Sequence, residues 1–335
     1  SDKDNSYTER STRHLQGWWR FDSSTTVANA DITKNISSDS SGNGRHAFVN
    51  DVGDRPNNAG SSPGTSNGIT PNPAIQTSSF EFDSQTTFVN IGTSNMWDKV
   101  IGAKSQNKQM TFHIWVLYHY QGGFVPNRTN FFPRLFDLGG QDVAVFLGDG
   151  VQTGADPMPI NFSARWDGSI VNWQTENDVV LSTKSFLNTS GTGDWQHIMV
   201  TYDANSTSNE PIIYYNGISQ SIKLTSNAPS GDFNGIVGNS GTVDCYIANN
   251  SSSLATGPAS DYRRFYGYMA DPAIWDITLG SKEARALYLA GYTGSGDAQM
   301  AITSKAAESK RDKMLHSKLH ITMKKFSLMK RNLIN

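Results

Sequence analysis

The stretch MTFHIWVLYHY, residues 110–120, carries the strongest strand pattern in the chain. Its side chains alternate between two faces with a period of two, and both faces are largely apolar. One face holds Phe112, Ile114, Val116, Tyr118 and Tyr120, and the other holds His113, Trp115, Leu117 and His119. A strand that is apolar on both faces lies within a sheet that is covered on both sides. The stretch therefore predicts a central strand with a packed layer over each face.

Short strand patterns surround this stretch on both sides. They fall at 15–21, 79–92, 134–140, 143–149, 161–174, 195–203, 212–222 and 265–277. Asp167-Gly168 and Asn216-Gly217 predict tight hairpins, because these pairs accept the positive φ that such turns need. Within the body of the chain only SKEARALYLAG, residues 281–291, predicts a helix. Many short strands and one late helix predict an all-β, two-sheet antiparallel β-sandwich.

The C-terminal segment differs from the rest in charge. Residues 304–335 hold nine Lys or Arg against two acids, a net charge of +7, while the whole chain has −2. Apolar positions recur there at helical spacing: Leu315, Leu319, Thr322, Phe326, Met329 and Leu333. We expect a polar arm at 1–13, one sandwich domain at 14–291 and a linker with a basic amphipathic tail at 292–335. Such a tail docks on a protein subunit, an anionic membrane or nucleic acid. We expect a protein partner or self-assembly, and not nucleic acid.

Cysteine content and hydropathy limit the cellular setting. The single cysteine, Cys245, excludes an internal disulfide framework and fits a buried small apolar side chain. No run of 18 apolar residues indicates a transmembrane helix. The first residues, SDKDNSYTER, show no secretory signal peptide. These features suit a viral or phage surface protein, so the expected location is extracellular or on a particle surface.

The order of the motifs along the chain is more informative than any one motif. The chain reads GWWRFD (17–22), DSSGNGRHA (39–47), FEFDSQTTFVNIG (80–92), MTFHIWV (110–116), GDWQHIMVTYD (193–203), IIYYNGI (212–218), FYGYMADPAIWD (265–276) and SKEARALY (281–288). Over residues 14–291 this resembles the concanavalin A-like lectin/glucanase superfamily, in particular its laminin-G-like jelly-roll modules. The resemblance implies two sheets packed face to face, a concave face that often meets carbohydrate, and a helix that closes the module. It also places Trp195 and Val200 on an inner face.

The glycine-rich turn DSSGNG allows two interpretations. It is a surface turn capped by Asp39, or its oxygen atoms hold a hard cation. The resemblance implies a structural Ca²⁺ bound by Asp22, Asn43 and Asp271. Ser23 and Pro272 stand where similar modules often carry a further acid, which lowers the negative charge of the site.

A set of aromatic and polar residues borders the expected concave face. Sugar rings pack on aromatic rings, while their hydroxyl groups need amides and acids. The candidate glycan-binding residues are Tyr118, Tyr120, Trp166, Asp167, Asn172 and Trp173. The aromatic members suit the sandwich core equally well. Trp166 is the least core-like of them, because it adjoins the Asp167-Gly168 turn.

Catalytic signatures are missing from the sequence. A glycosidase needs two carboxylates across a cleft, and no acidic pair lies on a predicted central strand. Glu176 and Asp178 follow a hairpin strand and fit a solvated turn. We therefore expect a non-catalytic carbohydrate-binding or adhesive surface module. The alternatives are a purely structural assembly or decoration subunit and a polysaccharide-degrading enzyme of the same superfamily.

Overall fold

The fold is taken from a computed structural model. It describes residues 13–21, 26–28, 35–50, 80–82, 88–118, 128–129, 132–148, 151–152, 157–180, 195–238, 243–249, 263–265 and 267–292. The predicted N-terminal arm, apart from residue 13, and the basic tail lie outside these residues, so both stay predictions. None of the helices in the described ranges is both long enough and apolar enough to cross a membrane.

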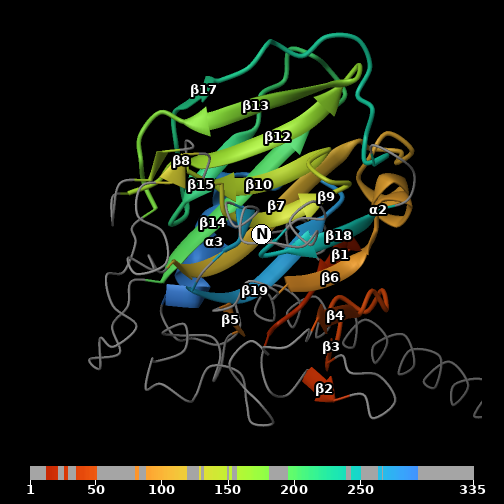
Figure 1. The fold of residues 1–335 in the computed structure, drawn as a ribbon, viewed down its shortest axis with the longest axis vertical. Coiled ribbons are helices and arrows are strands. Elements are labelled where there is room, and N and C mark those ends of the chain that lie inside the picture. Colours follow the sequence, from red (N-terminus) through yellow and green to blue (C-terminus); the bar gives the residue numbers. More distant parts are fainter. Residues whose placement is uncertain are drawn as a thin grey trace, which may run out of the picture.

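Two antiparallel sheets form the molecule. The smaller sheet has seven strands in the order β1-β19-β7-β14-β15-β16, with β5 beside β19. Its strands are β1 (Leu15–Trp18), β5 (Phe80–Phe82), β7 (Gln109–Tyr118), β14 (Gln196–Asp203), β15 (Ile212–Tyr215), β16 (Ile218–Ser219) and β19 (Gly267–Trp275). As predicted, β7 is a central strand, because it pairs with β19 on one side and β14 on the other (Figure 1).

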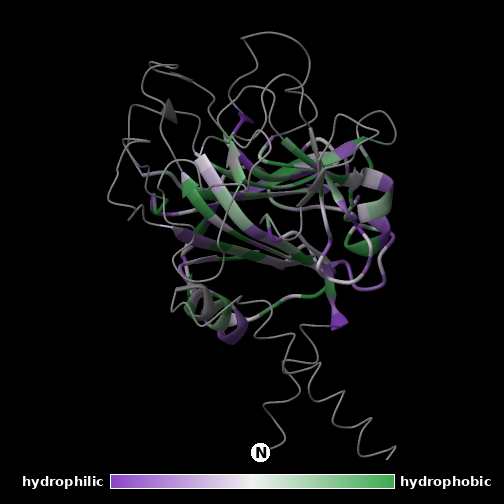
Figure 2. Ribbon diagram, turned by 90° about the horizontal axis from the view of Figure 1, so that it is seen from below, coloured by the Kyte–Doolittle hydropathy of each residue, from purple (hydrophilic) through white to green (hydrophobic). Residues whose placement is uncertain are grey.

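The larger sheet has ten strands in the order β17-β13-β12-β10-β9-β18-β6-β4-β3-β2. Its strands are β2 (Thr26–Ala28), β3 (Asn35–Ser37), β4 (Ala47–Asn50), β6 (Phe88–Thr93), β9 (Arg134–Leu138), β10 (Val143–Leu147), β12 (Ile160–Trp166), β13 (Ser169–Thr175), β17 (Ile222–Leu224) and β18 (Asp244–Ile247). A separate pair is formed by β8 (Arg128–Thr129) and β11 (Val151–Gln152). Seen edge-on, the two large sheets lie as two stacked layers (Figure 2).

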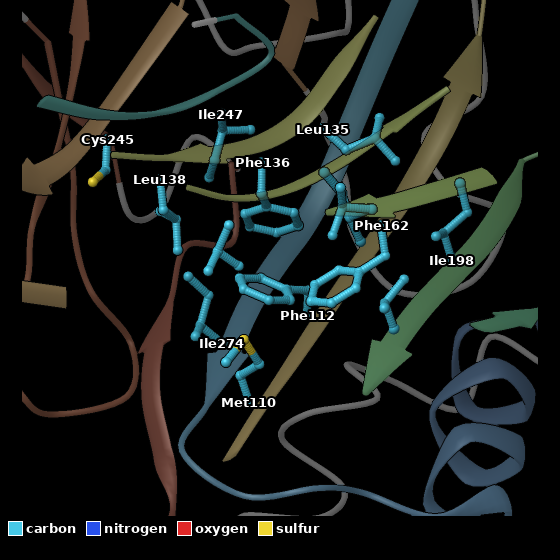
Figure 3. Packing of buried hydrophobic residues seen from close by; sticks show 14 of the residues in the cluster. Met110, Phe112, Leu135, Phe136, Leu138, Phe162, Ile198, Cys245, Ile247 and Ile274 are labelled. Atoms are coloured by element: carbon cyan, nitrogen blue, oxygen red, sulfur yellow. The ribbon is translucent and has the colours of Figure 1, made fainter. Parts of the chain in front are cut away.

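The main core fills the space between the two sheets. Phe112 from β7 meets Phe136 from β9 and Phe162 from β12, with ring centroids 5.2 and 6.4 Å apart (Figure 3). Val200 and Cys245 are also buried there, as predicted. The predicted all-β sandwich is therefore confirmed, and the predicted inner face of β7 points into this core as far as Tyr118.

A second apolar layer covers the outer face of the smaller sheet. There α3 (Ser281–Tyr292) packs its Ala284 and Leu287 over Trp115 and Leu117 of β7. Trp195 belongs to this outer layer, so the inner-face prediction for Trp195 is wrong. Residues 195 and 200 are an odd number of positions apart, and an extended chain points such residues to opposite faces.

One helix was not anticipated. Ser94–Val100 forms α2 directly after β6, with Thr93 as its N-cap, whose hydroxyl accepts a hydrogen bond from Met96 N at 3.4 Å. A seven-residue helix gives too short a repeat for a helical pattern to stand out. The two predicted hairpin turns are confirmed, since Asp167, Gly168, Asn216 and Gly217 all have positive φ.

Candidate functional site

A row of residues crosses the outer face of the larger sheet. Strand pairing places these residues in one register: Asn172 on β13, Ser163 on β12, Ala144 on β10, Asp137 on β9, Tyr246 on β18 and Asn90 on β6. Paired residues on neighbouring antiparallel strands point to the same face. The residues beside them in sequence are buried in the main core, so this row points away from it. We call it the polar row.

A second row runs parallel to the first and is linked to it. Gln174, Asn161, Phe146 and Arg134 are paired in register across β13, β12, β10 and β9. The Arg134 guanidinium lies 4.3 Å from the centroid of the Phe146 ring. Its Nε lies 3.3 Å from Asp137 Oδ2, which joins the two rows through an ion pair.

The two charged residues of these rows are both buried. Asp137 is 0% exposed, and Arg134 only 3%. Burial raises the pKa of Asp137, while the positive charge of Arg134 acts in the opposite direction. The Asp137 carboxylate also accepts a hydrogen bond from Gln141 N at 3.0 Å. An ion pair in this setting costs desolvation energy that an apolar surface would avoid.

Two members of the polar row have unused hydrogen-bonding capacity. Ser163 is 2% exposed, and its hydroxyl has no hydrogen-bond partner among the described residues. The Asn172 side chain is half-buried and makes no hydrogen bond to a described residue, although its backbone N–H donates to Ser226 Oγ at 2.8 Å. By contrast, Asn161 Nδ2 donates to Gly148 O at 2.6 Å. The row thus holds a buried hydroxyl without a described partner and a half-buried amide, and of the two the Asn172 amide is the one that solvent reaches.

Three of the predicted glycan-binding aromatics are core residues instead. Tyr118, Trp166 and Trp173 are 1%, 3% and 1% exposed. Trp166 Nε1 donates to Tyr202 Oη at 3.1 Å, and Tyr118 packs against Phe265. Strand alternation turns these rings inward, so they present no open face on which a sugar could stack. Trp166 is the most exposed of the three, but it is still buried, since the adjoining turn does not bring its ring to the surface.

The other predicted ligand residues divide between three places. Asn172 lies on the polar row, while Asp167 is exposed at the hairpin turn. Tyr120 lies outside the described residues. The sequence analysis missed Asn161 and Ser163, although NFSARW places a polar side chain at every second position of its strand. That alternation was the available signal.

The Asp39 carboxylate closes the glycine-rich turn. Its Oδ1 accepts from Trp18 N at 3.0 Å and from Ser41 N at 2.9 Å. Its Oδ2 accepts from Ser41 Oγ at 2.8 Å and from Arg45 N at 3.0 Å. The interpretation of Asp39 as the cap of this turn is therefore confirmed.

Two of the three predicted calcium ligands lie among the described residues, and both make hydrogen bonds within the protein. Asn43 is exposed, and its Nδ2 donates to Leu15 O at 2.7 Å. Asp271 is fully buried, and its Oδ1 accepts a hydrogen bond from the Trp18 indole. Asp22 lies outside the described residues. No group of three or more His, Cys, Asp or Glu in the described ranges could hold a metal ion. Because Asp22 lies outside those ranges, the calcium site stays a prediction.

The acidic pair considered for catalysis lies at the end of β13. Glu176 and Asp178 are both exposed, and Glu176 N donates to Ser221 O at 2.9 Å. This placement matches a solvated turn. Neither residue lies on the two rows described above.

Comparison with known proteins gives structural matches only. No protein-family model matches the sequence, and no curated protein does. The receptor binding domain of botulinum neurotoxin C/D mosaic serotype matches at 11% identity and a TM-score of 0.43, over 83% of this chain and 51% of that one. This chain thus spans about half the length of the neurotoxin domain.

Two further solved structures are similar. Domain 4 of AbnA, a GH43 extracellular arabinanase from Geobacillus stearothermophilus solved in complex with arabinotriose, matches at 15% identity and a TM-score of 0.38, over 81% of this chain and 97% of that one. A heptameric SAP-like pentraxin from Limulus polyphemus matches at 11% identity and a TM-score of 0.35, over 54% and 70% of the two chains. These identities and TM-scores are too low to carry an activity from those proteins to this chain.

Proposed function

We propose that the chain is a non-catalytic carbohydrate-binding module whose ligand lies on the polar row. The observation that carries the proposal is the buried, register-aligned set of polar side chains on one face of the larger sheet. Burying the Arg134–Asp137 ion pair and the Ser163 hydroxyl costs free energy. A face that served only to support the fold would avoid that cost with apolar residues.

The chemistry of the two rows favours an uncharged, hydroxyl-rich ligand. Arg134 and Asp137 neutralise each other, while a hydroxyl and amides supply both donors and acceptors. Phe146 and Tyr246 lie on the same face, but both rings are buried, at 7% and 4% exposed, against Phe132 and Phe88. Few well-placed polar groups beside apolar rings are typical of small-ligand sites.

The same rows support the absence of catalysis. Glycoside hydrolysis uses two carboxyl groups that flank the scissile bond. Among the described members of the two rows, Asp137 is the one acid, and it is paired with Arg134. The nearby Asp142 carboxylate, which also acts to raise the pKa of Asp137, is itself buried and paired with Arg165. Two carboxylates held in buried ion pairs are poorly suited to act as a nucleophile and a general acid.

The decisive test is a glycan array with the full chain, with arabinotriose among the ligands, followed by calorimetry on the best ligand. We expect Ser163→Ala to weaken binding about tenfold, the value of roughly one hydrogen bond. The same change leaves thermal stability unchanged or slightly higher, because it removes a buried hydroxyl that has no described partner.

Ser37→Ala is the matched control. Ser37 is also fully buried without a described hydroxyl partner, but it pairs with Ala47, a residue of the main core. This control should bind as the wild type does. Equal affinities for wild type and Ser163→Ala would overturn the proposed site, and an array with no binding would favour the structural subunit.

We also propose an extracellular or particle-surface setting, in which the basic tail at 304–335 attaches the module to a protein partner or to further copies. Its charge and helical stripe support this role. Light scattering on the full chain and on a chain ending at residue 292 tests it by the number of chains per particle. The same number in both would contradict self-assembly through the tail.

A further inference from the structure

A buried histidine lies between the smaller sheet and helix α3. The side chain of His197 on β14 is 0% exposed. Its ring centroid lies 4.9 Å from that of His113, 5.2 Å from that of Trp115 and 6.0 Å from that of Tyr288. Neither ring nitrogen has a hydrogen-bond partner among the described residues. His197 is therefore surrounded by rings, with no described group to share a proton.

Helix α3 covers this ring on the outer face of the smaller sheet. Tyr288 of α3 stacks on Trp115 at 5.9 Å with an interplanar angle of 20°. On the other side of the helix, the Gly217 turn approaches so closely that an added Cβ would lie 2.9 Å from Tyr288 Cβ. The strands of the smaller sheet lie below and beside His197. The helix therefore contributes to the burial of the imidazole, and its displacement would give water access to that ring.

We propose that α3 is an acid-released cover, in which protonation of His197 displaces the helix from the outer face of the smaller sheet. Displacement exposes a tryptophan-rich face that comprises Trp18, Trp115, Leu117, Trp195, Met199, Tyr268 and Trp275. This proposal concerns the sheet opposite the polar row and does not rest on carbohydrate binding.

The charged and titratable groups around His197 do not compensate for a positive charge there. On β7 the neighbour is His113, and on β19 it is Asp271, whose carboxylate accepts from the Trp18 indole. The groups on β15 and α3 are Tyr214, Lys282, Glu283, Arg285 and Tyr288. None of these forms a hydrogen bond or ion pair with His197.

The nearest acid of the helix is already used locally. Glu283 Oε2 accepts a hydrogen bond from Gly280 N at 3.0 Å and so helps begin α3. Arg285 lies 5.3 Å from the centroid of the Tyr288 ring and adds positive charge on the same side. The Trp115 and Tyr288 rings offer a cation–π contribution, but it is small beside the loss of hydration.

The direction of the pH dependence follows from burial. Burial lowers the pKa of His197 well below its usual value, and the nearby His113 acts in the same direction. The covered state thus binds fewer protons than the open state, in which the imidazole is hydrated. Below about pH 6.5 the opening equilibrium therefore rises as the pH falls, by up to about tenfold per pH unit for one histidine.

Hydrogen exchange with mass spectrometry on the full chain tests the cover. The readout is the opening equilibrium of a peptide spanning 281–292, corrected for intrinsic exchange and compared with a peptide from β7. We expect opening of α3 to rise by up to about tenfold per pH unit as the pH falls below about 6.5, while β7 stays protected. His197→Phe keeps a ring in this place but cannot be protonated. It should remove the dependence of α3 opening on the uptake of one proton, and so flatten the plot of log opening constant against pH.

Two further variants make the outcome decisive. Tyr288→Ala weakens the cover and should raise opening at every pH while it leaves the slope unchanged, which tests the proposal even if His197→Phe does not fold. His46→Asn removes an exposed histidine but keeps an acceptor for Asp39 N, and should behave as the wild type does. Equal slopes for wild type and His197→Phe, or loss of β7 protection together with α3, would overturn the proposal.

Discussion

A single carboxylate organises the turn that the sequence leaves open to two interpretations. Asp39 is 8% exposed and accepts hydrogen bonds from three backbone N–H groups and one hydroxyl. Three of these four donors belong to Ser41 and Arg45, in and directly after the turn, while Trp18 N belongs to β1. The carboxylate therefore ties the turn to the edge of the smaller sheet, a role that composition and turn statistics alone do not reveal.

Replacing Asp39 should destabilise the protein without any ligand being involved. Asp39→Ala leaves these donors without the carboxylate, and we expect the free energy of unfolding to fall by about 2 kcal/mol. Urea denaturation measures this loss. Ser41→Ala removes one of the four contacts to Asp39, together with the longer hydrogen bonds of Ser41 Oγ to Gln16 O and to Asn43, and should cost less. A change of equal size in both variants would contradict the central role of Asp39.

Calcium offers a separate test of the same turn. Because Asn43 and Asp271 are engaged in hydrogen bonds within the protein, we expect neither calcium nor a chelator to shift the melting temperature. Calorimetry in both conditions measures it. A higher melting temperature with calcium, lost in Asp22→Ala, would show that a site forms with residues outside the described ranges.

Neighbouring residues on β13 separate a core role from a binding role. Trp173 is 1% exposed, and its ring centroid lies 5.4 Å from that of Tyr202. Trp173→Ala should therefore cost about 4 kcal/mol of stability, as the loss of a large core side chain does. Asn172→Ala, on the opposite face, should weaken glycan binding and leave stability within about 0.5 kcal/mol. Thermal denaturation measures the stability of both variants, and calorimetry measures their glycan binding. If Trp173 were the ligand residue, Trp173→Ala would weaken binding with little loss of stability.

At the level of elements, the two hairpins show what local sequence predicts well. Asp167-Gly168 and Asn216-Gly217 form the same kind of turn, but their surroundings differ. An added Cβ at Gly168 would meet no atom within 4 Å, whereas at Gly217 it would meet Tyr288 and Arg285 of α3. The turn type was evident from the sequence, while the contact with α3 depends on tertiary packing.

This difference gives a matched pair of substitutions. Gly168→Ala carries only the cost of a left-handed backbone for alanine, about 1 kcal/mol. Gly217→Ala adds the clash with α3 and should cost about 1–2 kcal/mol more. Urea denaturation gives both values, and hydrogen exchange of residues 281–292 shows whether the extra cost lies in α3. Equal costs would mean that the helix adjusts freely.

For the whole molecule, the sequence predicts the sandwich much better than the site. The period-two pattern of β7 is apolar on both faces, so its central place and both packed layers follow from the sequence. The polar row draws on six strands, and its register depends on how they pair. Asp137 and Ser163 become neighbours of Ala144 only through that pairing, which no local pattern specifies.

The buried titratable groups of the two sheets act on pH stability in opposite directions. Burial lowers the pKa of His113 from 6.5 to about 4, and it lowers that of His197 as well. The folded protein keeps both imidazole rings neutral, whereas the unfolded chain takes up protons on them below about pH 6.5. The free energy of unfolding therefore falls as the pH drops below that value. Asp137 opposes this trend, because its raised pKa means that acid relieves the cost of keeping it ionised.

The histidines should dominate, because there are two of them and Arg134 offsets part of the Asp137 shift. From its pKa of about 4, His113 alone should lower the free energy of unfolding by about 2–3 kcal/mol between pH 7.5 and pH 4.5. Urea denaturation at both pH values measures the loss. His113→Phe should reduce the loss by about that amount, while His46→Asn, at an exposed histidine, should leave it unchanged. A loss of the same size in His113→Phe and wild type would place the acid sensitivity elsewhere, and a gain in stability at pH 4.5 would identify Asp137 as the dominant group.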